Sequence, residues 1–242
     1  MSDDAIVSSL APTGSLRVTI NLGNAVLARR NDDGSAGGVS VEIAAELGRR
    51  LGLPVEHVVV DGAAKAVEAV RSGAADAGFF AVDPLRGAGI AFTAPYVLIE
   101  GCYVVRNDSP IATNADVDRA GHRVAVGGGS AYDLFLSREL KSAQIVRAPT
   151  SQAVVDTFVG QHLEVAAGVR QQLEKDLKRH DGLRLIDEPF MVIRQAMGVG
   201  EARGEAAHRY VAAFVEEIKA SGRIAQWLAQ YGIEGVTVAP AA

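Results

Sequence analysis

Two short segments carry the residues best suited to chemistry, and the first is a run of glycines ending in a serine. Gly127, Gly128, Gly129 and Ser130 follow the apolar stretch Val124–Val126. Glycines let the backbone turn sharply, and the first N–H groups of a following helix can hold an anion. Ser130 can cap that helix or donate its hydroxyl to the same anion. The segment lacks the pattern of a phosphate-binding P-loop, a dinucleotide fingerprint or a nucleophile elbow, so a tight turn with a capping serine is the structural alternative.

The second segment places an aspartate and an arginine on a loop after a buried strand. Ala75–Phe80 predicts the strand, and Asp83 and Arg86 follow on a loop that Pro84 restricts. Ligands of open parallel sheets bind beyond the carboxyl ends of the strands. The planar fork of an arginine makes two parallel bonds to a carboxylate. The alternative is a surface ion pair, which contributes less than about 1 kcal/mol.

The remaining reactive side chains give weaker indications. The five histidines show no ligand spacing, so neither a metal site nor another cofactor is expected. Cys102 is the only cysteine, which excludes an intrachain disulfide, and its apolar neighbours predict a buried, inert thiol. Glu100, just before the strand that contains Cys102, is interpreted as an exposed residue.

Short β-branched runs alternate with amphipathic stretches and must position these residues. This pattern predicts an α/β fold with a mostly parallel sheet and helices on both faces. Ser40 is expected to cap a helix that Gly52 ends. The expected strands are 16–20, 55–60, 75–80, 102–105, 123–126, 144–146, 165–167 and 195–199, and the expected helices are 41–51, 65–71, 131–140, 151–159, 171–179, 205–220 and 224–231.

Composition excludes several classes of protein. The chain has 242 residues, and 24 Lys+Arg against 29 Asp+Glu give a net charge of −5, which argues against nucleic acid or an anionic membrane as a partner. No apolar run approaches the roughly 20 residues of a membrane span. The first ten residues lack the pattern of a secretory signal peptide, which favours a cytoplasmic protein or a mature form with an added methionine.

Together these segments resemble the substrate-binding proteins of bacterial ABC importers, in the polar amino-acid group known as extracellular solute-binding protein family 3. The resemblance implies the type II periplasmic-binding-protein fold, with two Rossmann-like lobes joined by two hinge strands. The first lobe would comprise residues 1–99 and 197–242, and the second 100–196. The resemblance is carried by residues 38–47, Asp76, Arg86, Ile90–Tyr96, Val126–Ser130, Gly222, Trp227 and Tyr231–Gly232.

The resemblance also implies roles for individual residues. Arg86 would bind the ligand carboxylate from the first lobe. Ser130 and the Ala131 N–H, which follow Gly129, would hold it from the second. The backbone of Ala81 and the side chain of Asp83 would face an ammonium group, although the loop before Arg86 is about two residues shorter than usual.

Two positions depart from the family pattern. Val169 stands where the second lobe normally offers an aspartate to the ammonium, and Arg170 follows it. Arg170 would suit a second acidic group on the ligand, or it is a solvated residue at the start of a helix. Asn24 stands near the place of an aromatic residue that often stacks on the ligand. An ordinary α-amino acid is therefore a weakened hypothesis.

The expected function is reversible capture of a small carboxylate-bearing solute between the lobes, by hinge closure, for ABC-type import. An ABC permease would be the partner, and the protein would be a periplasmic monomer. Two alternatives remain open: a dehydratase resembling the cyclohexadienyl dehydratases, and a cytoplasmic metabolite sensor. The dehydratase would need a proton donor, and no glutamate stands beside Val169 to supply it.

Overall fold

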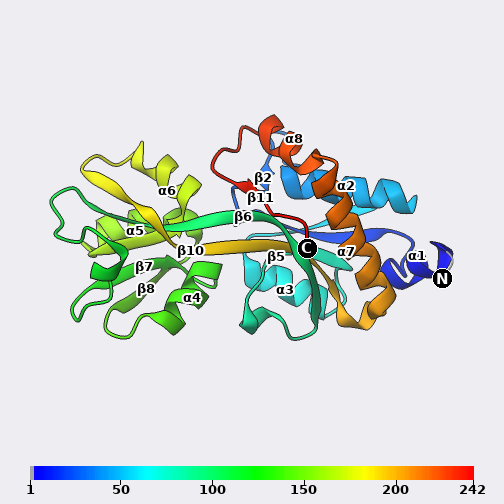
Figure 1. Cartoon of the computed structure of the whole chain (residues 1–242), viewed down its shortest axis with the longest axis horizontal. Coiled ribbons are helices and arrows are strands. Elements are labelled where there is room, and N and C mark those ends of the chain that lie inside the picture. Colours follow the sequence, from blue (N-terminus) through cyan, green and yellow to red (C-terminus); the bar gives the residue numbers. More distant parts are fainter. Residues whose placement is uncertain (1–2) are drawn as a thin grey trace. The chain divides into compact units, whose positions relative to one another are not determined.

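The chain forms two compact units. A computed structural model describes residues 3–242. The first ten residues, which lack the pattern of a signal peptide, include Met1 and Ser2, and these two lie outside the described residues. Unit 1 comprises 1–98 and 194–242, and unit 2 comprises 99–193. Two long strands, β6 (Ile90–Arg106) and β10 (Leu183–Gly200), pass through both units, as Figure 1 shows.

Unit 1 is built on a twisted sheet in the order β4-β1-β5-β10. β1 pairs in parallel with β4 and β5, whereas β10 is antiparallel to β5. The elements are α1 (Asp3–Leu10), β1 (Leu16–Asn21), β2 (Arg29–Arg30), β3 (Ala36–Gly37), α2 (Val39–Leu51), β4 (Val55–Val60), α3 (Ala63–Arg71), β5 (Ala77–Ala81), η1 (Pro84–Arg86), η4 (Glu201–Arg203), α7 (Gly204–Ala220), α8 (Arg223–Gln230) and β11 (Thr237–Val238).

Apolar periodicity explains why these segments adopt their structure. β5 is buried at every position, as expected of a central strand in a parallel sheet. Ala66, Val67 and Val70 recur at helical spacing, and through them α3 packs against Phe80 and Ile90. The strands and helices predicted for this part of the chain are therefore confirmed.

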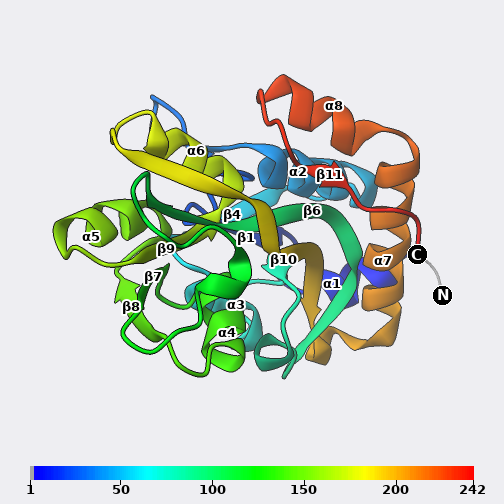
Figure 2. The same ribbon diagram turned by 60° about the vertical axis from the view of Figure 1, so that its left-hand side comes forward.

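Unit 2 repeats the same layout around β6-β9-β7-β8. β7 is parallel to both neighbours, and β6 is antiparallel to β9. Helices α5 and α6 share one core with these strands, and their course can be followed in Figure 2. The elements are η2 (Asn114–Asp116), β7 (Arg123–Gly127), α4 (Ala131–Glu139), β8 (Gln144–Ala148), η3 (Ser151–Ala153), α5 (Val154–Gly160), β9 (Val165–Val169) and α6 (Arg170–Leu177).

The structure corrects one sequence prediction and adds elements that were not predicted. Ser40 does not cap α2: the helix begins earlier, with Gly38 as its N-cap, and Ser40 is buried inside its first turn. Helix α1 was not predicted. The first half of β10 was missed as well, because Leu183–Arg194 shows no regular apolar alternation and becomes a strand only by pairing.

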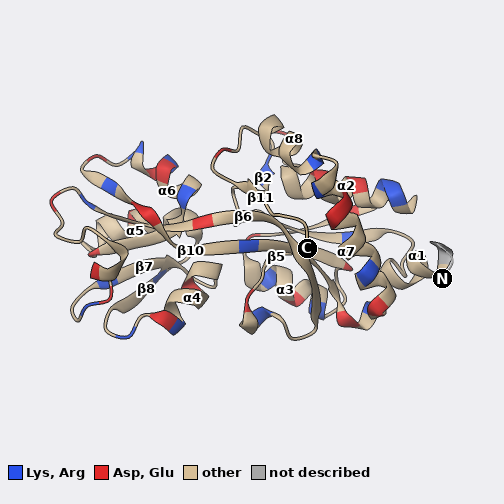
Figure 3. Ribbon diagram, in the orientation of Figure 1, with Lys and Arg blue, Asp and Glu red and all other residues tan. Residues whose placement is uncertain are grey.

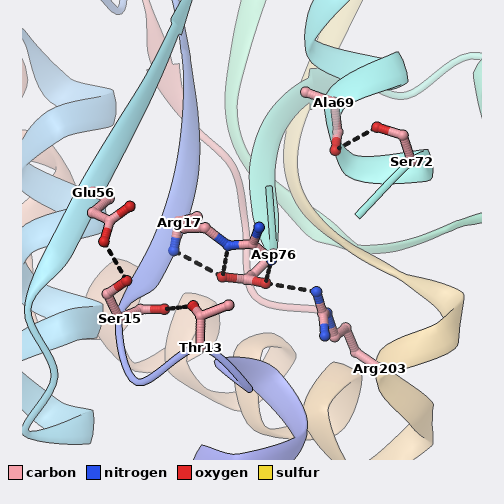
Figure 4. A network of polar contacts seen from close by, with 8 residues as sticks. All are labelled: Thr13, Ser15, Arg17, Glu56, Ala69, Ser72, Asp76 and Arg203. Atoms are coloured by element: carbon pink, nitrogen blue, oxygen red, sulfur yellow. Dashed lines mark hydrogen bonds and ion pairs between the residues drawn. The ribbon is translucent and has the colours of Figure 1, made fainter. Parts of the chain in front are cut away.

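A buried ion-pair network joins β1, β5 and the start of α7. The Asp76 carboxylate is fully buried, accepts the Arg17 backbone N–H at 2.8 Å, and lies 2.7 Å from the Nη2 atoms of both Arg17 and Arg203 (Figure 4). Buried charges are costly unless they are paired and hydrogen-bonded, as this carboxylate is. The network therefore fixes the amino end of β5, and with it the strand whose other end carries Asp83 and Arg86.

Charges of both signs are scattered over the helices and strands of each unit, as Figure 3 shows. Among the described residues, no helix is long and apolar enough to cross a membrane.

Candidate functional site

The first candidate segment is a short turn at the carboxyl end of β5. Ala81 pairs with Gln195, and the turn η1 follows. The Asp83 side chain caps this turn, because its Oδ1 accepts the Leu85 N–H at 2.9 Å. The Arg86 N–H in turn donates to the Asp83 carbonyl at 2.9 Å. Asp83 and Arg86 therefore belong to one compact turn, which follows Ala81 at the end of β5.

Arg86 is buried rather than displayed on the surface. Only 6% of Arg86 is exposed, and the same fraction of Asp83, which excludes the surface ion pair considered above. Burial lowers the pKa of the Arg86 guanidinium, and the Asp83 charge opposes that shift only in part. The guanidinium still carries its charge at neutral pH, because an arginine is effectively always protonated. An anionic group bound there would stabilise the charged form of the guanidinium.

Asn24 lies at the same edge of the unit 1 sheet. β1 is parallel to β5, so the turn that follows Asn21 and the turn that follows Ala81 lie beyond the same ends of neighbouring strands. The Asn24 carbonyl accepts N–H groups from Leu27 and Ala28, and its N–H donates to Asn21. Its side chain is half-buried. Asn24 thus organises the turn through its backbone.

The second candidate segment joins β7 to α4 in unit 2. Gly129 has a left-handed φ of 70°, which a glycine adopts without strain. At Gly127 a Cβ would lie 2.7 Å from the Tyr132 hydroxyl, so no side chain fits there. The Ser130 Oγ accepts the Asp133 N–H at 3.0 Å, which confirms the predicted helix cap.

The donors that this loop offers to a ligand lie at the start of α4. Ala131 and Tyr132 occupy the first two helical positions, where N–H groups have no carbonyl partner within the helix. The Ser130 hydroxyl uses its oxygen as the cap acceptor and keeps its hydrogen for donation. The Gly129 N–H is already used within the unit, because it donates to the Asp133 carboxylate at 2.8 Å.

Arg170 begins helix α6 and is held by acidic groups of its own unit. Its Nε donates to Glu100 Oε2 at 2.6 Å, and its Nη1 lies 3.5 Å from Asp187 and 3.8 Å from Glu174. Burial acts to lower the pKa of Arg170, but Glu100 and the other partners raise it on balance. Arg170 is therefore not a solvated residue. To bind a second acidic group of a ligand, it would have to exchange these partners for that group. Glu100 is 40% exposed at its side chain and is an ion-pair partner.

Asp133 and Arg147 were missed by sequence reasoning. Asp133 is 3% exposed, and its Oδ2 accepts both the Gly129 N–H and the Arg147 Nε, the latter at 3.0 Å. An acidic residue three positions after a capping serine resembles a capping box, and that spacing could have marked Asp133. Arg147 lies on β8, and nothing local in the sequence connects it with the loop.

The prediction for Cys102 can also be compared with the structure. Cys102 is buried, and burial raises the pKa of its thiol to about 11, which confirms an inert cysteine. Within residues 3–242, no group of three or more His, Cys, Asp and Glu side chains is arranged to hold a metal ion.

Comparison with known proteins gives one family and many structures. The family model described as bacterial extracellular solute-binding proteins, family 3, matches residues 16–234. No match was found among curated proteins.

Three solved structures illustrate the fold that this chain shares. The solute receptor for L-cysteine of Neisseria gonorrhoeae has a TM-score of 0.79 at 22% identity, with 95% of each chain covered. A mutant of ArgBP from T. maritima has a TM-score of 0.78 at 18% identity, covering 95% of this chain and 100% of that one. An ancestral amino-acid-binding protein, described as a precursor of cyclohexadienyl dehydratase, has a TM-score of 0.75 at 17% identity, covering 93% and 98%.

Proposed function

Because the chain belongs to the bacterial extracellular solute-binding proteins of family 3, we propose that it reversibly binds a small carboxylate-bearing solute, an amino acid or a related organic acid. The observation that carries this proposal is the buried guanidinium of Arg86 at the carboxyl end of β5. A guanidinium withdrawn from water binds a carboxylate through two charge-assisted bonds, each contributing about 1.5–3 kcal/mol.

Unit 2 supports the same ligand chemistry. The Ser130 hydroxyl and the Ala131 N–H are hydrogen-bond donors at the start of a nine-residue helix, where the helix dipole favours a negative charge. Arg170 is engaged by Glu100, so we assign it to the support of the sheet edge and not to ligand binding. Asp83 caps η1 and is the acidic side chain nearest Arg86 in sequence, so it remains the candidate acceptor for a ligand ammonium.

The role in the cell follows from the family. We propose delivery of the solute to an ABC permease by a monomer in the periplasm, since the family typically works there with ABC transporters.

A substitution of Arg86 tests the proposal. A screen of amino acids, dicarboxylates and prephenate should yield at least one ligand that raises the melting temperature of the wild type. Arg86→Ala should weaken binding of that ligand by about 100- to 4000-fold, because removing one partner of a buried pair costs about 3–5 kcal/mol. Arg86→Lys keeps the charge but loses the planar fork, and should bind with intermediate affinity.

The matched control is Arg30→Ala, which removes an exposed arginine from the same unit. Its ligand-induced shift should equal that of the wild type. Equal shifts in wild type and Arg86→Ala would overturn the assignment of Arg86.

A dehydratase is the second candidate function, because one matching structure is described as a precursor of cyclohexadienyl dehydratase. Against it, no acidic residue stands at the end of β9, where Val169 is the last residue and Arg170 begins α6. Glu100, on the neighbouring strand β6, is engaged by Arg170. Turnover of prephenate to phenylpyruvate, followed by absorbance, decides between the two: any turnover above background supports the dehydratase.

A further inference from the structure

We propose that Asp133 determines which anions the Gly127–Ser130 loop accepts, so that a carboxylate binds there while phosphate- and sulfate-like groups are rejected. This inference rests on the proposed function and names the ligand chemistry of the same site. It concerns unit 2 alone.

The Asp133 carboxylate lies against the glycine loop. Its side chain is 4% exposed and folds back over the first turn of α4. Oδ2 accepts the Gly129 N–H at 2.8 Å, and Oδ1 accepts the Ser137 hydroxyl at 3.2 Å. A carboxylate of the protein therefore already occupies the position that an anion takes in an open glycine loop.

Three successive N–H groups of the loop are used internally: Gly128 donates to the Ala148 carbonyl, Gly129 to Asp133 and Ser130 to the Gly127 carbonyl. The Ser130 hydroxyl and the N–H groups at the start of α4 are left for a ligand. These donors suit the two oxygens of a carboxylate. A tetrahedral anion exposes more oxygens and needs the backbone donors that are already used here.

Asp133 is buried, whereas its partner Arg147 is 54% exposed at its side chain, so water screens the arginine more strongly than the carboxylate. The Asp133 charge repels a ligand that carries a single negative charge. It repels a sulfate, which carries two negative charges, about twice as strongly at the same distance. Donor number and charge therefore discriminate in the same direction.

Amide chemical-shift titrations of the full-length 15N-labelled chain test the inference at about pH 8, where inorganic phosphate is mainly a dianion. Acetate is the carboxylate probe, and sulfate and phosphate are the dianions, all at equal ionic strength. In the wild type, acetate should shift the Ser130 and Ala131 amides, and the dianions should not. In Asp133→Asn, sulfate and phosphate should shift the same amides, and the affinity ratio of acetate to sulfate should fall at least about tenfold. Asp133→Ser should behave in the same way and replaces Asp133→Asn if that variant does not fold.

The control is Asp118→Asn. Asp118 also accepts backbone N–H groups in unit 2, from Lys141, Ser142 and Ala143, but away from the loop. Asp118→Asn should leave the affinity ratio of acetate to sulfate unchanged. A merely structural role of Asp133 would weaken all the anions together and leave the ratio constant, which would overturn the inference. So would sulfate binding to the wild type as tightly as acetate. If acetate shifts neither amide in the wild type, the carboxylate site itself is wrong, and the inference falls with it.

Discussion

At the scale of single residues, Ser130 has two roles that substitutions can separate. As the N-cap of α4, its oxygen accepts the Asp133 N–H. As a proposed ligand donor, it offers its hydroxyl hydrogen. The cap contributes to the stability of the fold, and the donated hydrogen bond contributes to the affinity for the ligand.

Ser130→Ala should lower the free energy of unfolding by about 1 kcal/mol, because alanine cannot cap a helix. It should also weaken the carboxylate ligand found in the thermal screen by about tenfold, the value of one hydrogen bond. Ser130→Gly should lose only a few tenths of a kcal/mol of stability and still lose the affinity. Urea unfolding and calorimetric titration measure the two effects. A glycine variant that binds like the wild type would show that the hydroxyl does not touch the ligand.

At the scale of elements, the buried Glu46 of helix α2 forms an ion pair with helix α8. The Glu46 side chain is 5% exposed and accepts bonds from Arg49 and Arg50 of its own helix, at 2.8 and 2.9 Å. The Arg223 Nη1 at the start of α8 lies 2.6 Å away. The hydrogen bond from Arg49, together with the other arginines, outweighs burial and lowers the pKa of Glu46 from 4.5 to about 2.

This lowered pKa predicts how stability depends on pH. The folded-state pKa lies below the unfolded one, so the contribution of Glu46 is complete above about pH 4.5 and is lost as the pH falls toward 2. Glu46→Gln should cost about 2 kcal/mol of unfolding free energy at pH 7, and the difference from the wild type should shrink as the pH falls.

Denaturant unfolding from pH 7 to pH 2.5 measures that difference. Glu139→Gln, an exposed glutamate of α4, is the control and should follow the wild type throughout. A constant gap between Glu46→Gln and the wild type across this range would contradict the assignment.

At the scale of the whole molecule, β6 and β10 are the two strands that pass from one unit to the other. The division between the units falls between Leu98 and Ile99 and between Ile193 and Arg194. The family resemblance implies that the lobes close on their ligand, and this remains a prediction.

Small-angle X-ray scattering tests the closure. A saturating amount of a ligand from the thermal screen should reduce the radius of gyration of the wild type, because a ligand that contacts both lobes favours the closed state. Arg86→Ala at the same ligand concentration should keep the value of the ligand-free protein. An unchanged radius in the wild type, with binding confirmed by calorimetry, would exclude hinge closure.

The sequence by itself determined the local features of this protein. The alternation of apolar strands with amphipathic helices predicted the α/β layout, because a strand or helix buries its own apolar face wherever it lies in the fold. The position of Arg86 after β5 and the cap at Ser130 were predicted for the same reason: each depends on residues only a few positions away.

Only the tertiary structure decided which distant residues meet. Arg147 comes from β8 to hold Asp133, and Glu100 comes from β6 to engage Arg170. The first half of β10 owes its strand structure to pairing in the sheet. Pairing between segments far apart in sequence depends on how the whole chain folds back on itself, and local spacing carries no record of it.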